Sequence, residues 1–186
     1  MYQVEGTHDV GGNWLSADEY RDRMTEFKSV SFRFQALQVY GVPWEQGPFR
    51  EFMRSGIRHV DPGDPRLARL KERLEGGRRV ERVQVVRPPV SDYLRFAFTF
   101  FHHSALVGED LRILDSSRVD TADLPDYDFV LLDGNAVIRL HYSPEDGSVV
   151  GRELLPEADL EEYRSYREYS RRCSVPFLEY EDAASY

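Results

Sequence analysis

Residues that could bind or activate a small molecule gather just after the segment VQVVRPPV, where Ser91, Asp92, Tyr93 and Arg95 stand close together. They fall where an apolar strand would end and a helix would begin. In open α/β sheets, ligands bind beyond the carboxyl ends of strands, and free backbone N–H groups at a helix start attract anions. The spacing predicts a pocket for a small anionic ligand or a partner peptide, with Arg87 and Arg95 as anion contacts. Alternatively, Ser91 and Asp92 only cap the helix and Arg95 pairs with an acidic neighbour.

Three aspartates form a second group, with Asp126 and Asp128 two residues apart and Asp133 at the end of the same apolar run. Side chains alternate along a strand, so Asp126 and Asp128 would share a face. Carboxylate oxygens suit magnesium or calcium, but Asp133 is explained by a hairpin turn at residues 133–135. We therefore expect Asp126 and Asp128 to line the ligand pocket, and we predict no metal site.

Arg33 and His141 complete the predicted ligand-binding set. In an enzyme, an arginine would hold an anionic group while Tyr93 or His141 moved a proton. The sequence contains no Gly-rich phosphate loop, no GxSxG elbow and no dinucleotide fingerprint. No catalytic residue and no cofactor are therefore predicted.

The histidine pair His102-His103 and the single cysteine, Cys173, are expected to be structural. Adjacent residues on a helix point to different sides, and neither HExxH nor CxxC occurs. Cys173 lacks the signature of an activated thiolate and cannot form an internal disulfide. A reduced, cytoplasmic setting is the simplest fit to this cysteine content.

Composition limits the class of partner. The formal net charge is −9, so the field of the whole molecule repels phosphate backbones and no direct nucleic-acid binding is expected. No apolar run approaches the roughly 18 residues of a membrane span, and residues 1–15 do not resemble a secretory signal. A soluble protein of open oligomeric state is expected.

The pattern of apolar residues predicts one α/β domain, with α+β as the alternative, in which a single mixed sheet is flanked by helices. Residues 1–15 are expected to form a flexible arm, 16–175 the domain, and 176–186 an acidic aromatic tail. Capping signals and helical periodicity predict helices at 16–28, 48–54, 64–75, 91–107 and from Pro156 onward. Alternation and β-branched runs predict strands at 31–40, 80–86, 111–114, 127–132, 136–142 and 149–154.

The segments PVSDYLRF, GEDLRIL and DFVLLDG occur here in that order. Together they resemble an actinobacterial family known only as a domain of unknown function, often encoded beside Xre-type helix-turn-helix regulators. The resemblance implies a possible regulator partner, and it implies no activity.

The order of elements, ending in an apolar hairpin that contains VLLDG, is also similar to one half of a phospholipase D-like domain. Active members carry the pattern H-x-K-x-x-x-x-D, whose histidine is the nucleophile and whose lysine holds the phosphate. Aligning Asp133 with the final aspartate places Asp126 and Asp128 at the histidine and lysine positions. This resemblance implies a pocket without the usual chemistry, as in sugar- or effector-sensing relatives.

These observations favour a non-catalytic cytosolic binding module, an accessory or regulatory protein that recognises a small anionic ligand or a helix-turn-helix regulator. Two alternatives stay open. One is a small enzyme of specialised metabolism that uses the arginine, tyrosine, aspartate and histidine side chains of the pocket. The other is a toxin–antitoxin component whose acidic surface binds a basic partner.

Overall fold

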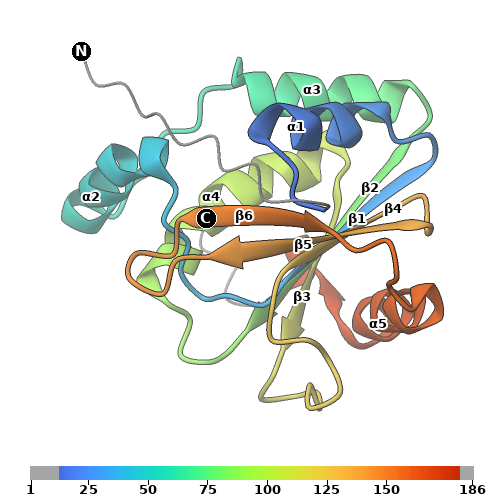
Figure 1. Cartoon of the computed structure of the whole chain (residues 1–186). Coiled ribbons are helices and arrows are strands. Elements are labelled where there is room, and N and C mark those ends of the chain that lie inside the picture. Colours follow the sequence, from blue (N-terminus) through green and yellow to red (C-terminus); the bar gives the residue numbers. More distant parts are fainter. Residues whose placement is uncertain (1–12, 181–186) are drawn as a thin grey trace.

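The computed structural model describes residues 13–180 of the chain (Figure 1). Its α-helices are α1 (Ala17–Glu26), α2 (Gln46–Ser55), α3 (Pro65–Glu75), α4 (Asp92–Val107) and α5 (Leu160–Cys173). Its strands are β1 (Val30–Gln35), β2 (Arg79–Val86), β3 (Asp110–Asp115), β4 (Phe129–Leu132), β5 (Ala136–Tyr142), β6 (Val149–Leu154) and β7 (Val175–Pro176). Two short 3-10 helices are η1 (Pro43–Glu45) and η2 (Phe177–Glu179).

The strands form one mixed sheet in the order β6-β5-β4-β1-β2-β3-β7. β1, β2 and β3 run parallel, and every other neighbouring pair is antiparallel. Helices cover the sheet on both faces: α1, α3 and α4 lie on one side and α5 on the other (Figure 1). The prediction of an α/β fold with a single mixed sheet flanked by helices is confirmed.

Each face has its own apolar packing. Toward α5, Phe34 of β1 stacks on Phe129 of β4 with ring centroids 5.4 Å apart, and Tyr163 of α5 packs edge-on against Phe129 at 4.9 Å. On the opposite face, buried side chains of α4 such as Phe96 and Phe98 fill the space above the sheet. Beneath α1 and α3 the sheet also carries polar side chains, among them Arg33 and Arg82, and there a cavity opens.

Two predicted boundaries are wrong for identifiable reasons. The strand predicted to reach residue 40 ends at Gln35, because the next backbone N–H, that of Ala36, donates to the Asp128 carboxylate at 2.8 Å instead of to a neighbouring strand. The last helix begins at Leu160 rather than at Pro156. Asp159 caps it, because its side chain accepts hydrogen bonds from the first turn.

The chain ends were predicted to form an arm and a tail. Residues 1–12 of the expected arm lie outside the described residues, while Asn13 and Leu15 exchange backbone hydrogen bonds with the edge strand β6. At the start of the expected tail, Phe177 and Tyr180 are buried against Phe98 of α4. Within residues 13–180, no helix has both the length and the apolar character required to cross a membrane.

Candidate functional site

A cavity of about 630 Å³ lies between the sheet and the helices α1, α3 and α4. Its volume falls in the range of small-molecule binding pockets. Among the described residues, its lining includes two glutamates, Glu45 and Glu109, and a larger set of arginines: Arg33, Arg58, Arg66, Arg69, Arg73, Arg82 and Arg152. Seven cations therefore face two carboxylates in a protein whose overall charge is −9.

The floor of the cavity is built by two neighbouring parallel strands with the same short pattern. β1 carries Arg33 and Gln35, β2 carries Arg82 and Gln84, and the pairing register sets Arg33 beside Arg82 and Gln35 beside Gln84. Residues two apart on a strand share a face. The two Arg-x-Gln segments thus place four polar side chains where the centre of a sheet ordinarily carries apolar ones.

The two floor arginines differ in how they are neutralised. Arg82 donates from Nε to the buried Glu109 carboxylate at 2.8 Å, and from Nη1 to Gln35 Oε1 at 3.3 Å. Arg33 has one carboxylate near it, that of Asp128, at 4.0 Å. Its Nε atom is buried and has no hydrogen-bond partner among the described residues, while the side chain as a whole is 30% exposed toward the cavity.

Asp128 lies beneath Arg33 and joins several segments. Its Oδ1 accepts hydrogen bonds from the Ala36 N–H at 2.8 Å and from the Tyr40 hydroxyl at 3.2 Å, and its Oδ2 accepts from the Tyr142 hydroxyl at 2.8 Å. Burial raises the pKa of Asp128, although Arg33 and these hydrogen bonds favour the charged form. The same surroundings keep the pKa of Arg33 raised, because the nearby tyrosines and Asp128 outweigh the effect of its burial.

Gln84 is fully buried at the other end of the floor. Its amide nitrogen donates to the backbone carbonyls of Leu37 and Val85, both at 2.9 Å, and more weakly to that of Gln35 at 3.3 Å. Its Oε1 has no partner within the described part of the chain. A buried acceptor left unpaired costs on the order of 1–3 kcal/mol, and a bound water or ligand that donates to it would remove that cost.

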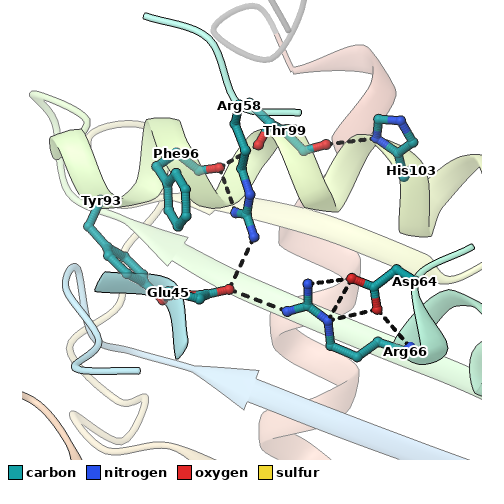
Figure 2. Close-up of polar contacts among 8 residues, drawn as sticks. All are labelled: Glu45, Arg58, Asp64, Arg66, Tyr93, Phe96, Thr99 and His103. Carbon is teal, nitrogen blue, oxygen red and sulfur yellow. Dashed lines mark hydrogen bonds and ion pairs between the residues drawn. The ribbon is translucent and has the colours of Figure 1, made fainter. Parts of the chain in front are cut away.

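Glu45 organises a second wall, drawn in Figure 2. Its Oε1 accepts from Arg58 at 3.2 Å and from Arg66 at 3.4 Å, and its Oε2 accepts from the Tyr93 hydroxyl at 2.7 Å. The guanidinium of Arg58 also lies 3.7 Å from the ring centre of Phe96. These contacts hold both arginines in fixed positions at the edge of the cavity.

Helix α3 contributes a row of three arginines, Arg66, Arg69 and Arg73, at helical spacing on one face. Arg66 donates to Asp64 at 2.7 Å and is largely neutralised. Arg69 and Arg73 form no hydrogen bond or ion pair with any residue from 13 to 180 that the structure shows. Burial and repulsion from Arg78 and Arg69 lower the pKa of Arg73.

The structure brings two of the predicted ligand-binding residues to the cavity and a third beneath it. Arg33 and Tyr93 line the cavity. Asp128 is completely buried under Arg33. Asp126, predicted to share its face, is exposed at the surface.

The remaining predicted residues lie elsewhere. Ser91 accepts a hydrogen bond from Leu94 N–H and donates to the Gln38 carbonyl, so it caps α4. Asp92 and Arg95 form an exposed pair at 3.6 Å. Arg87 donates to the Ala36 carbonyl at 2.7 Å. These four residues mark the carboxyl end of β2, outside the cavity lining.

His141 is also apart from the cavity. Its Nε2 lies 2.8 Å from Glu153 of β6, and its ring packs against Trp14 with centroids 4.8 Å apart. Among residues 13–180, no three or more histidine, cysteine, aspartate or glutamate side chains gather in an arrangement that could hold a metal ion.

Sequence reasoning missed most of the cavity arginines. Two signals were present: the spacing of Arg66, Arg69 and Arg73, which puts three cations on one helix face, and the Arg-x-Gln segments at 33–35 and 82–84. Neither shows by itself that the helix lies over the strands.

Comparison with known proteins gives a family and no relative of known activity. The family model described as "Domain of unknown function (DUF6879)" matches residues 18–182. No curated protein and no solved structure matches the chain.

Proposed function

The chain belongs to the DUF6879 family, a domain of unknown function, and we propose from its cavity that it is a binding protein for a small anionic ligand. In this proposal the ligand occupies the arginine-lined cavity, with Arg33 as its principal contact. The protein acts by binding, as an accessory or regulatory module, and not by turning the ligand over.

The observation that carries the proposal is the contrast between cavity and exterior. The lining holds seven arginines and two glutamates, whereas the whole chain carries nine more negative than positive charges. Four of these arginines pair with carboxylates, whereas Arg69, Arg73 and Arg152 have no ion pair within the described residues. Cations gathered in this way repel one another, and an anion that enters the cavity relieves that repulsion. Such a concave cationic site focuses the field on a small anion, while the acidic exterior disfavours an extended polyanion such as nucleic acid.

The cations that line the cavity within the described residues are all arginines. A guanidinium offers a planar, forked set of donors that fits phosphate or carboxylate oxygens in pairs, whereas lysine presents a single point charge. Stacking of Arg66 over Phe100 at 4.0 Å and of Arg82 over Phe101 at 5.0 Å further restricts the guanidinium planes. Preorganised donors lower the entropic cost of binding.

The charge states of the lining favour binding over proton transfer. The two lining carboxylates, Glu45 and Glu109, are each held by arginine. Burial raises the pKa of the Tyr93 hydroxyl, and Glu45 raises it further; burial and Asp128 likewise raise the pKa of Tyr142. Neither tyrosine is poised to exchange a proton near neutral pH. The enzyme and toxin–antitoxin alternatives stay predictions without a specific supporting observation.

A helix-turn-helix regulator as partner, an actinobacterial gene context, a cytoplasmic location and a phospholipase D-like origin also stay predictions. They are compatible with the proposed role, because a module that binds a small effector can report it to a regulator. Co-purification with a neighbouring regulator, with and without the effector, would test the partner.

The proposed function is tested by thermal unfolding with inorganic phosphate as the probe, at constant ionic strength. Binding to the folded state raises the melting temperature in proportion to the logarithm of ligand concentration. We expect phosphate to raise it above a sodium chloride reference, and we expect the double variant Arg33→Gln/Asp128→Asn to lose that response. The paired change keeps the buried site neutral, so the variant is designed to stay folded.

Two controls make the result specific. Arg54→Gln removes an exposed arginine that pairs with Glu51 outside the cavity, and it should respond as the wild type does. Arg95→Gln tests the carboxyl end of β2, where the sequence first suggested an anion contact. Loss of the phosphate response in Arg95→Gln but not in the double variant would contradict the cavity as the site.

A further inference from the structure

We infer that the ligand is a ring-bearing diphosphate, of the nucleoside diphosphate class, with its phosphates between the sheet floor and α3. This inference rests on the proposed function and makes it more specific. Its basis is a second, unneutralised pair of arginines, Arg69 and Arg73, on the wall opposite Arg33, together with an exposed tryptophan in the same lining.

The two groups of arginines come from different layers of the fold. Arg33 rises from β1 in the sheet, whereas Arg69 and Arg73 belong to α3, which lies over that face of the sheet (Figure 1). A single small anion on Arg33 would satisfy the floor and leave the helix pair without a counter-charge. Two linked anionic groups could bind both walls at once.

The pair on α3 is built without a protein counter-ion. Arg69 and Arg73 are four residues apart, so their side chains are neighbours on the helix surface, and like charges at this spacing repel. The preceding arginine of the row, Arg66, is neutralised by ion pairs with Asp64 and Glu45. No described carboxylate bonds to Arg69 or Arg73. Arg69 is exposed to solvent, whereas Arg73 is half-buried, so the gain from an anionic ligand is greatest at Arg73.

Charge and size agree with a diphosphate. A diphosphate ester carries a charge of roughly −2 to −3 at neutral pH. Within the described residues, the lining arginines without an ion pair are Arg69, Arg73 and Arg152, and Arg33 has a single carboxylate, that of Asp128, at 4.0 Å. A cavity of about 630 Å³ is also much larger than one phosphate requires and suits a compound of nucleotide size.

We assign the contact with the ligand's ring to the side chain of Trp44. This side chain lines the cavity although it is 70% exposed. Trp44 lies in η1, and the segment that leads into η1 is anchored to the turn between β5 and β6, since Gly41 N–H donates to the Gly147 carbonyl at 2.8 Å. A Cβ atom at Gly41 would lie 2.1 Å from the Asp146 carbonyl oxygen, so the two loops approach as closely as glycine allows. An exposed indole on an anchored rim is a platform on which a planar ring can stack.

A second, independent feature points to a ligand in the same cavity. Gln84 lines it, is fully buried and keeps Oε1 unpaired, and the Arg33 Nε–H on the same floor is unpaired as well. The Arg33 Nε–H can donate to a phosphate oxygen, whereas Gln84 Oε1 can only accept, as from a ligand hydroxyl or amino group. Polar groups of this kind are seldom left without partners in a folded protein. They lie on the floor and are separate from the α3 arginines and from Trp44.

The test is isothermal titration at constant ionic strength with orthophosphate, pyrophosphate, adenosine and the diphosphates ADP, GDP, CDP and UDP. We expect pyrophosphate to bind at least tenfold more tightly than orthophosphate, and at least one nucleoside diphosphate to bind at least tenfold more tightly than pyrophosphate. The variant Arg69→Gln/Arg73→Gln should retain orthophosphate binding and lose the advantage of pyrophosphate. Trp44→Ala should lose the advantage of the nucleoside diphosphate.

Lys71→Gln is the matched control, because Lys71 is an exposed cation of the same helix that pairs with Glu75 away from the cavity. It should bind every probe as the wild type does. Equal affinity for orthophosphate and pyrophosphate, an undiminished pyrophosphate advantage in the α3 double variant, or nucleoside diphosphates no better than pyrophosphate would each overturn the inference. Any of these results would leave phosphate binding at Arg33 intact, whereas absence of all phosphate binding would refute the proposed function itself.

Discussion

The guanidinium of Arg33 lies 4.0 Å from the carboxylate of Asp128, with the arginine reaching into the cavity and the aspartate completely buried below it. Asp128 also accepts hydrogen bonds from Ala36, Tyr40 and Tyr142. The pair therefore couples the binding surface to the end of β1 and to β5. A ligand that moves Arg33 toward the cavity would weaken the contact of Arg33 with Asp128, the residue whose carboxylate binds the backbone at the end of β1.

Removal of Arg33 alone should destabilise the protein. Arg33→Gln leaves the Asp128 carboxylate buried without its cation, and we expect a loss of about 1–3 kcal/mol in the free energy of unfolding at neutral pH. The pKa of Asp128 is already raised by burial and should rise further in the variant. A raised folded-state pKa of an acid means that stability is greatest at low pH and falls as pH rises through that pKa. Urea unfolding from pH 4 to pH 8 should therefore show the variant losing stability with rising pH relative to the wild type.

The double variant Arg33→Gln/Asp128→Asn controls for this effect. It should recover most of the lost stability and show a weaker pH dependence, because no buried charge is left unpaired. If Arg33→Gln were as stable as the wild type across the range, the pair would not support the cavity floor.

Asp133 should provide stability that disappears in acid. Its carboxylate accepts hydrogen bonds from the backbone N–H groups of Lys28, Ser29 and Val30 at 2.7–3.0 Å. Partial burial opposes the charged form, but these bonds prevail and lower the pKa of Asp133 to about 2. A depressed pKa contributes stability above the unfolded-state value of about 4, and that stability is lost as pH falls toward 2.

Asp133→Asn suits this test because asparagine tolerates the left-handed backbone at this position, where φ is 52°. We expect the variant to be roughly 1–2 kcal/mol less stable than the wild type at pH 7, with the difference vanishing near pH 2. Thermal unfolding at several pH values measures it. A difference that stays constant with pH would show that the charge of Asp133 is unimportant.

The attachment of α5 depends on a buried carboxylate of β2. Glu81 is almost completely buried, accepts from Arg167 Nε at 2.7 Å and Nη2 at 2.8 Å, and also pairs with Arg171. Burial alone would raise the pKa of Glu81, but the two arginines lower it. Glu81→Gln should cost about 3 kcal/mol of stability, since Arg167 loses its counter-charge and Arg171 keeps only its pair with Asp110.

Hydrogen exchange of α5 amides should increase in that variant ahead of exchange in β1 and β2. Glu168→Gln serves as the control, because Glu168 is exposed on α5 and lies 4.0 Å from Arg172. Uniform destabilisation by both changes would indicate that Glu81 has no special role in docking the helix.

Local signals predicted much of the fold. Ser16 forms the expected capping box, Ser91 caps α4, and Gly108 ends that helix in the left-handed conformation. These features depend on residues a few positions apart, so the sequence reveals them directly. The same holds for the hairpin turn at 133–135.

The cavity could not be predicted in the same way. Arg33 and Arg82 become neighbours only through the parallel pairing of β1 with β2, and Arg73 joins them only because α3 crosses over that face. Strand β1 ends at Gln35 because the next backbone N–H binds the carboxylate of Asp128, a residue more than ninety positions away. Contacts between residues so far apart leave no local pattern in the sequence. The pattern at the end of β2 therefore predicted a ligand site at Ser91, Asp92 and Arg95 and not in the cavity.

The central claim is that a small anion binds at Arg33, and the most direct measurement is the NMR signal of the Arg33 Nε–H group during titration with pyrophosphate at constant ionic strength. That group is buried, so its proton should exchange slowly enough to be observed. We predict a saturable shift of the Arg33 signal, with the exposed Arg95 signal unchanged. A saturable shift of Arg95 with no response from Arg33 would contradict the account and place anion binding at the carboxyl end of β2.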